Sequence, residues 1–279
     1  MKNLVSGLFR TNKSEEKNFD SHSINELMSF METKVFPCSE CGYFFQLDQP
    51  EPLSISPCSK CGTGNFVPSK VGPFWLYKYC GDGGMSRVYK ATCSLTPAVE
   101  YAVKILPKPM RGVKELEDAL KREAEITLLF NDHPNSVKVV ECDVDQDIAY
   151  VVTEFADGGT LEELINKKGK LDEKETVTIC FQLLQIIEYI YSKGYLYRDL
   201  KPQNIVVSPE YKLTLMDYGI CLPKGTAAHQ DTDIVDGSPH YVPPERITDG
   251  EEDIRSEIYS IGMLIYHMLT GKTYFSGDT

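Results

Sequence analysis

The sequence predicts an α+β fold: a large domain with strands and one helix first and further helices after them, preceded by a small cysteine-rich segment. Apolar runs of strand length come first, interrupted by one helix-like stretch over 113–130. These runs are 74–80, 87–92, 101–106, 137–142 and 148–154. Apolar residues then recur at helical spacing over 183–190, and Gly194 is placed to end that helix. Four cysteines, in two close pairs, precede every strand.

The composition is that of a globular chain. Of its 279 residues, 42% are hydrophobic and 25% are charged. With 29 Lys+Arg against 41 Asp+Glu, the net charge is −12, so we expect no nucleic-acid partner. No apolar run approaches the roughly 20 residues that span a bilayer. The patch 4–9 is too short for a secretory signal, so we expect no membrane segment and a cytoplasmic location.

We expect three parts along the chain. Residues 1–34 are polar at first and then carry apolar residues at spacings of three and four, which predicts a flexible arm with one short helix. The cysteine-rich segment covers 35–69, and the large domain covers 70–279.

The four grouped cysteines have the spacing of a metal site. Cys38, Cys41, Cys58 and Cys61 form the pattern C-x2-C-x16-C-x2-C, and a glycine follows each pair. Two cysteines three positions apart on a tight turn can direct both sulfurs at one ion, and two such turns complete a tetrahedron. The segment resembles a zinc ribbon. Two disulfides and an iron site of rubredoxin type are the alternatives, and with all four positions filled by sulfur a zinc ion would be structural.

Two features of the first strands could hold a phosphate-bearing ligand. Gly81, Asp82, Gly83 and Gly84 form a glycine-rich turn between strands, where backbone N–H groups can approach phosphate oxygens. Alone, this pattern equally fits an ordinary hairpin turn. Lys104 lies in an otherwise apolar strand and needs a partner, for which Glu123 in the next helix is suited.

Three later segments decide the interpretation. They are Tyr197-Arg198-Asp199-Leu200-Lys201-Pro202-Gln203-Asn204, Asp217-Tyr218-Gly219, and Gly237-Ser238-Pro239-His240-Tyr241-Val242-Pro243-Pro244-Glu245. From Phe74 onward, the chain resembles the protein kinase family in the order, spacing and type of these motifs. The Asp-Leu-Lys-Pro-x-Asn form is similar to serine/threonine kinases, and the style of the motifs is similar to bacterial eukaryotic-like kinases. The resemblance implies a bilobal protein-kinase fold, with a β-rich N-lobe and a helical C-lobe that lacks its last helices.

The resemblance also implies a role for each motif residue. Asp199 would accept the proton of a serine or threonine hydroxyl in a protein substrate, and Lys201 would steady the ATP γ-phosphate. Asn204 and Asp217 would hold Mg²⁺, while Lys104, fixed by Glu123, would hold the α- and β-phosphates. The implied nucleotide site also includes the glycine-rich turn, Val88, Ala102, Thr153 as gatekeeper, Glu154 to Ala156 as hinge, and Val206.

Arg198 is implied to meet a phosphate on the segment 217–245. This segment carries Thr226, Thr232, Ser238 and Tyr241. Thr232 is our candidate for self-phosphorylation, and Ser238 is expected to be structural.

Four residues depart from the family pattern. Tyr197 replaces a histidine, and Tyr218 replaces a phenylalanine, so its hydroxyl needs a partner. Thr127 stands where a large apolar residue is usual, which is expected to weaken the active alignment. Glu257 replaces an aspartate that braces the loop around Asp199, and its extra methylene is expected to carry a modest penalty.

The sequence ends after a predicted helix over 253–269, where the family has further helices. We therefore expect a fragment in which the apolar residues of 258–265 face solvent and Glu245 lacks its partner. The favoured function is a protein serine/threonine kinase. An ATP-binding pseudokinase-like scaffold or an inactive kinase fragment is the alternative, although Lys104, Asp199 and Asp217 are all present.

Overall fold

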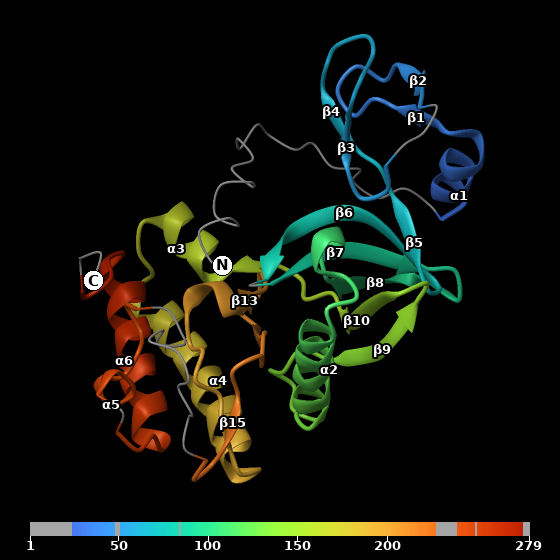
Figure 1. Ribbon diagram of the computed structural model, residues 1–279. Helices are drawn as coiled ribbons and strands as arrows, with labels where there is room; N and C mark the ends of the chain where they lie inside the picture. The colour runs from blue at the N-terminus through green and yellow to red at the C-terminus, as the bar shows by residue number, and fades with distance from the viewer. Residues whose placement is uncertain (1–23, 48–50, 84, 227–238, 249, 276–279) are drawn as a thin grey trace. The chain divides into compact units, whose positions relative to one another are not determined.

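The computed structural model describes residues 24–47, 51–83, 85–226, 239–248 and 250–275 (Figure 1). Gly84, Thr232, Ser238 and most of the predicted arm lie outside this described part. The chain forms two compact units. Unit 1 comprises Met1–Arg111 with Val144–Tyr150, and unit 2 comprises Gly112–Asp143 with Val151–Thr279.

The cysteine-rich segment is built from two small hairpins after one helix, drawn in blue in Figure 1. The elements are α1 (Ile24–Thr33), β1 (Val35–Pro37), β2 (Phe44–Gln46), β3 (Ile55–Pro57) and β4 (Gly64–Phe66). β1 pairs with β2 and β3 pairs with β4, both antiparallel. Phe36, Phe45 and Val67 fill the core together with two of the cysteines, so this core is very small.

A six-stranded sheet has the order β5-β6-β7-β8-β10-β9. Its strands are β5 (Ser69–Val71), β6 (Phe74–Gly83), β7 (Ser86–Cys93), β8 (Thr96–Ile105), β9 (Val139–Asp145) and β10 (Ile148–Glu154). Within unit 1, the ring of Phe66 on β4 lies 5.9 Å from that of Tyr89 on β7, so the small hairpins contact the sheet. Gln146 and Asp147, both with positive φ, form the two-residue turn between β9 and β10.

The described helices of unit 2 begin at a side-chain cap in three of five cases. They are α2 (Lys114–Leu128), α3 (Leu161–Lys168), α4 (Glu173–Ser192), α5 (Pro244–Ile247) and α6 (Ile254–Thr270). Thr160 and Glu163 form a capping box on α3, and Asp172 and Glu175 form one on α4. Gly194, with φ of 90°, follows the end of α4, as its position in the sequence predicts.

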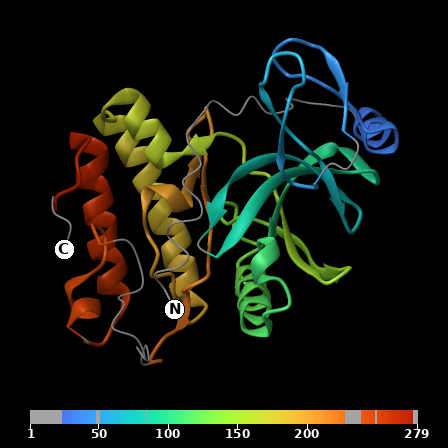
Figure 2. The ribbon, with the colours of Figure 1, turned by 45° about the horizontal axis from the view of Figure 1, so that its top comes forward.

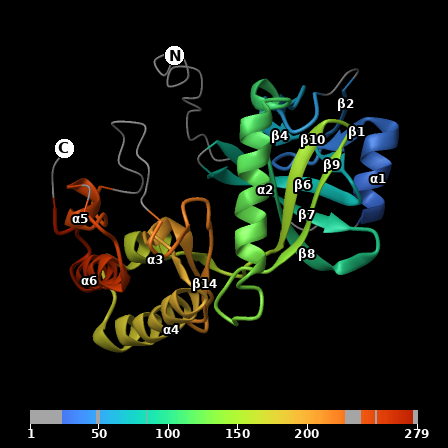
Figure 3. The same ribbon diagram turned by 60° about the horizontal axis from the view of Figure 1, so that its bottom comes forward.

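The core of unit 2 joins α4 to α6 and to a small sheet, and Figures 2 and 3 show α4 and α6 side by side. The short strands are β11 (Gly159–Thr160), β12 (Tyr195–Leu196), β13 (Ile205–Val207), β14 (Leu213–Leu215) and β15 (Leu222–Pro223). The order β11-β13-β14 forms one sheet, and β12 pairs with β15. These pairings fix both ends of the loop between β12 and β13, which carries the Asp199 motif.

Two sequence expectations are wrong. On α6, Ile261 and Leu264 are buried in the core with α4, and only Ile258 of the predicted apolar face is largely exposed. Glu245 has a partner, because its carboxylate accepts a hydrogen bond from Ser256 Oγ. No helix in the described part has both the length and the apolar character needed to cross a membrane.

Candidate active site

Asp199 is held in one orientation by two neighbours on its own loop. Its Oδ2 accepts hydrogen bonds from Lys201 Nζ and from Asn204 Nδ2, both at 2.7 Å. Asn204 Nδ2 also donates to the Asp199 carbonyl at 3.0 Å. The other carboxylate oxygen, Oδ1, is buried and has no hydrogen-bond partner among the described residues. Because a buried acceptor without a donor is costly, this atom is suited to receive a hydrogen bond from a bound hydroxyl.

Asp217 follows β14 and is tied to the same loop. The backbone N–H of Met216 donates to the Asn204 carbonyl at 2.8 Å, which brings the two segments together. Asp217 has a φ of 52°, and its Oδ1 accepts from Gly219 N at 3.2 Å. Asn204 and Asp217 thus offer side-chain oxygens from adjacent segments, and oxygen is the ligand that Mg²⁺ prefers.

Two buried tyrosines support both segments from below. Tyr218 packs between Phe130, with ring centroids 5.3 Å apart, and Tyr197, also at 5.3 Å. The Tyr218 hydroxyl lies 2.8 Å from Ser136 Oγ, which confirms that this hydroxyl has a partner. Burial raises the pKa of Tyr218, so the hydroxyl stays neutral. Tyr197 donates to the Met216 carbonyl and therefore links the two motifs directly.

Comparisons with known proteins agree with this geometry. The sequence model of the family described as protein kinase domain matches residues 74–279. The chain belongs to the protein kinase family. It is 36% identical over 205 residues to a probable serine/threonine-protein kinase of Clostridium perfringens (73% of this chain, 30% of the relative). It is 32% identical over 208 residues to the serine/threonine-protein kinase PrkC of Bacillus subtilis (75% and 32%). The chain therefore spans about a third of the length of these relatives.

The loop that carries Asp199 is braced from α6. Glu257 is buried, and its Oε1 accepts the Arg198 N–H at 2.8 Å. Burial raises the pKa of the Glu257 carboxyl to about 7. Glutamate can therefore make the bracing contact expected of an aspartate at this position.

The Arg198 side chain has an acidic partner in the described structure, and its expected contact with a phosphate stays a prediction. Its guanidinium is paired with Glu252, which lies outside the segment 217–245.

Thr127, the last of the four residues that depart from the family pattern, is buried, and its hydroxyl donates to the Glu123 carbonyl at 2.7 Å. Sequence reasoning missed Glu252, Arg246 beside it, and Ser136, because none of them belongs to a local pattern.

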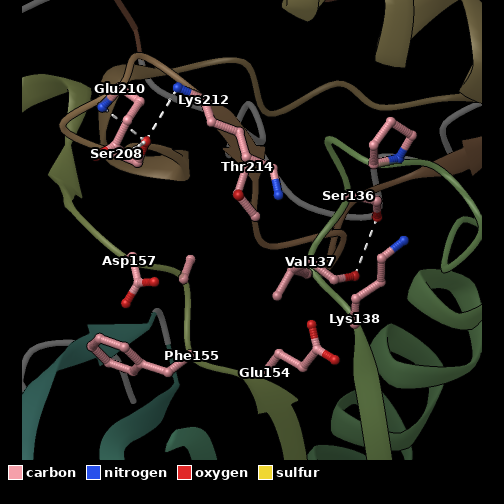
Figure 4. A pocket seen from close by; sticks show the side chains of 12 residues that line it. Ser136, Val137, Lys138, Glu154, Phe155, Asp157, Ser208, Glu210, Lys212 and Thr214 are labelled. Carbon is pink, nitrogen blue, oxygen red and sulfur yellow. Dashed lines mark hydrogen bonds between the residues drawn. The ribbon is translucent and has the colours of Figure 1, made fainter. Parts of the chain in front are cut away.

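The predicted hinge borders a cavity of about 460 Å³ within unit 2 (Figure 4). In Figure 4, Glu154, Phe155 and Asp157 line one side, and the turn with Ser208, Glu210 and Lys212 lies opposite. The lining residues are Pro134, Ser136, Val137, Lys138, Glu154, Phe155, Ala156, Asp157, Ser208, Glu210, Lys212 and Thr214. Since Asp199, Asn204 and Asp217 are absent from this lining, the cavity does not connect the hinge to the catalytic loop.

The remaining residues of unit 1 that are predicted to bind the nucleotide lie on adjacent strands. Val88 on β7 is in register with Lys104 on β8, and Ala102 lies two positions before Lys104 on the same face. Gly81, with φ of 152°, and Asp82 lie at the end of β6, and Gly83 closes that strand. Thr153 on β10 and Val206 on β13 belong to unit 2, as does Glu123 on α2. The pairing of Lys104 with Glu123 stays a prediction.

The four cysteines of the ribbon converge. Their sulfur atoms all lie within 4.8 Å of one another, with Cys38 to Cys61 at 3.4 Å and Cys41 to Cys58 at 3.8 Å. Zinc–sulfur bonds of about 2.3 Å in a tetrahedron place sulfurs about 3.8 Å apart, so the cluster fits a zinc ion. All four are free cysteines, which argues against the disulfide alternative. Elsewhere, Cys80 and Cys142 are exposed.

The turns around the cluster bring N–H groups close to two of its sulfurs. Gly42 and Gly62 have φ of 66° and 76°, and each donates its N–H to the carbonyl of the first cysteine of its pair at 2.9 Å. Lys60 N and Asn65 Nδ2 lie 3.4 and 3.8 Å from the sulfurs of Cys58 and Cys38. Backbone hydrogen bonding, chiefly from Cys41, lowers the pKa of Cys38 to about 6. With four sulfur ligands, a zinc site here is closed and structural.

Proposed function

We propose that this chain is a protein serine/threonine kinase that transfers the γ-phosphate of ATP to protein hydroxyls. The observation that carries this proposal is the state of Asp199, with one oxygen held by Lys201 and Asn204 and the other buried without a donor. The family match supports it, and so do the names of the bacterial relatives. The phosphate acceptors are serine and threonine side chains of protein substrates, and self-phosphorylation is one such reaction.

The proposed step moves one proton and one phosphoryl group. The substrate hydroxyl donates a hydrogen bond to Asp199 Oδ1 and gives up its proton to this carboxylate as the oxygen attacks the γ-phosphorus. A new oxygen–phosphorus bond forms, and the bond to the β,γ-bridging oxygen breaks, so that ADP leaves. Lys201 places its positive charge beside Asp199, near the transferred group.

The other residues bind and orient the nucleotide. Asn204 and Asp217 would hold Mg²⁺, which supplies positive charge that neutralises the phosphates. Lys104, fixed by Glu123, and the backbone of Gly81 to Gly84 would hold the phosphates. Val88, Ala102 and Val206 would enclose the adenine, and the backbone of Glu154 to Ala156, beside Thr153, would hydrogen-bond to it.

In this proposal the chain has an arm over 1–34, a zinc ribbon over 35–69 and a kinase domain over 70–279. The zinc ribbon has a structural role. Nine free cysteines are compatible with a reducing, cytoplasmic location. A ribbon of this size has too small a core to fold alone, so a zinc ion would supply much of its folding free energy.

The test is transfer from labelled ATP by the purified chain with Mg²⁺, followed by phosphoamino-acid analysis. We expect label on serine and threonine. Asp217→Asn should remove it, whereas Asp132→Asn, at an exposed aspartate of unit 2, should not. Nucleotide binding without transfer in the wild type would favour the scaffold alternative, and neither binding nor transfer would refute the proposal for this chain.

A further inference from the structure

Three buried charged side chains meet beneath the catalytic loop. Arg198 donates to Glu252 Oε1 from Nε at 3.1 Å and from Nη2 at 2.7 Å. Arg246 donates to Glu252 Oε2 from Nε at 3.0 Å and from Nη2 at 2.6 Å. The exposed fractions of these side chains are 4% for Arg198, 2% for Arg246 and 10% for Glu252. One carboxylate thus accepts four hydrogen bonds from two guanidinium groups that are almost fully removed from water.

The cluster is connected to the backbone that places Asp199. Arg246 Nη1 donates to the Arg198 carbonyl at 2.7 Å, and Glu257 accepts the Arg198 N–H at 2.8 Å. Arg198 has a φ of 72°, a left-handed conformation that an arginine rarely adopts and that persists only when its surroundings enforce it. Contacts to its N–H, carbonyl and side chain together hold this residue, and the next residue is Asp199.

Glu252 is the group on which these contacts depend. Two buried guanidinium groups repel each other and are costly to bury without an anion between them. Burial raises the pKa of the Glu252 carboxyl, but the hydrogen bonds from Arg246 and Arg198 outweigh this effect and hold the pKa below its usual value. The carboxylate is therefore charged, and it compensates for both cations from within unit 2.

We propose that Glu252 is a built-in anion that positions Asp199 through Arg198, so that the catalytic loop keeps its geometry without a phosphate on the segment 217–245. A phosphorylated side chain commonly orders a loop by pairing with an arginine. Here Glu252 already fills that role for Arg198. The inference rests on the proposed kinase activity only where it concerns turnover, and Glu252 is a positioning residue that does not touch the reacting atoms.

The experiment compares the wild-type chain, freed of phosphate by a protein phosphatase and checked by intact mass, with Glu252→Gln and Glu251→Gln. Glu251 is the exposed neighbour of Glu252 and provides the matched control. Hydrogen exchange of the amides over 197–204 reports the order of the loop without requiring turnover. Peptide phosphorylation gives kcat and the KM for ATP.

We expect the dephosphorylated wild type and Glu251→Gln to keep full protection and full kcat. Glu252→Gln should exchange at least tenfold faster over 197–204 and lose at least tenfold in kcat, with the KM for ATP within twofold, because Glu252 does not contact the nucleotide. Protection in Glu252→Gln equal to that of the wild type would overturn the proposal.

The phosphatase comparison keeps the test decisive if Glu252→Gln does not fold. In that case, unchanged protection of the wild-type loop after phosphate removal supports the built-in anion, and loss of protection overturns it. If no variant transfers phosphate, the proposed function fails, but the exchange data still judge the role of Glu252.

Discussion

Replacing Glu257 by glutamine should change how the stability of unit 2 depends on pH. Glu257 is buried on α6, and burial raises its pKa from 4.5 to about 7. A carboxyl whose pKa is raised in the folded state stabilises the fold fully below its unfolded pKa, and this contribution is lost as the pH rises through 7. At about 1.4 kcal/mol for each pKa unit, the loss between pH 4.5 and pH 7 is about 3 kcal/mol.

The measurement is urea unfolding followed by far-UV circular dichroism at pH 5, 6, 7 and 8, since α3, α4 and α6 supply helix signal from unit 2. Glutamine keeps an oxygen that can accept the Arg198 N–H but cannot titrate. The free energy of unfolding of the wild type, relative to Glu257→Gln, should therefore fall by about 2.5 kcal/mol between pH 5 and pH 8. Glu251→Gln serves as the exposed control, with no such trend. A constant difference between wild type and Glu257→Gln would refute the reasoning.

Three further perturbations test separate parts of the structure. Tyr218→Phe should lower the free energy of unfolding by about 1 kcal/mol, because Ser136 loses its partner. In the Tyr218→Phe background, Ser136→Ala should destabilise the protein less than it does in the wild type, and an additive double-mutant cycle would contradict the contact. Native mass spectrometry should find one zinc ion per chain in the wild type and none in Cys58→Ser, and equal zinc content in both would contradict the assigned ligands. Asp172→Ala removes the capping box of α4 and should cost about 1 kcal/mol in urea unfolding, whereas no change would contradict its capping role.

The parts of the fold that the sequence predicts well are those encoded locally. The alternation and spacing of apolar residues located β6, β7, β9, β10 and α2 within a few residues, whereas α4 begins at Glu173, well before the predicted stretch 183–190. Gly194 ended α4 as expected, because a glycine tolerates the positive φ needed there. The need of the Tyr218 hydroxyl for a partner was also predictable from chemistry, although Ser136, 82 residues away, was not.

The features that sequence reasoning missed depend on which distant segments meet. Arg198 and Glu252 are separated by 54 positions, and no spacing rule connects them. The apolar face of α6 was expected to be exposed because further helices cover it in the family, yet α4 covers much of it within this chain.

The most direct test of the central claim is a comparison of wild type with Asp199→Asn in single-turnover phosphoryl transfer and in Mg-ATP binding. Asparagine preserves the shape of the side chain but cannot take the hydroxyl proton. If Asp199 is the base, transfer should fall by about 10²- to 10⁴-fold, while the Kd for Mg-ATP changes less than threefold. Transfer at the wild-type rate by Asp199→Asn would contradict the account, as would a loss of transfer that is explained entirely by lost nucleotide binding.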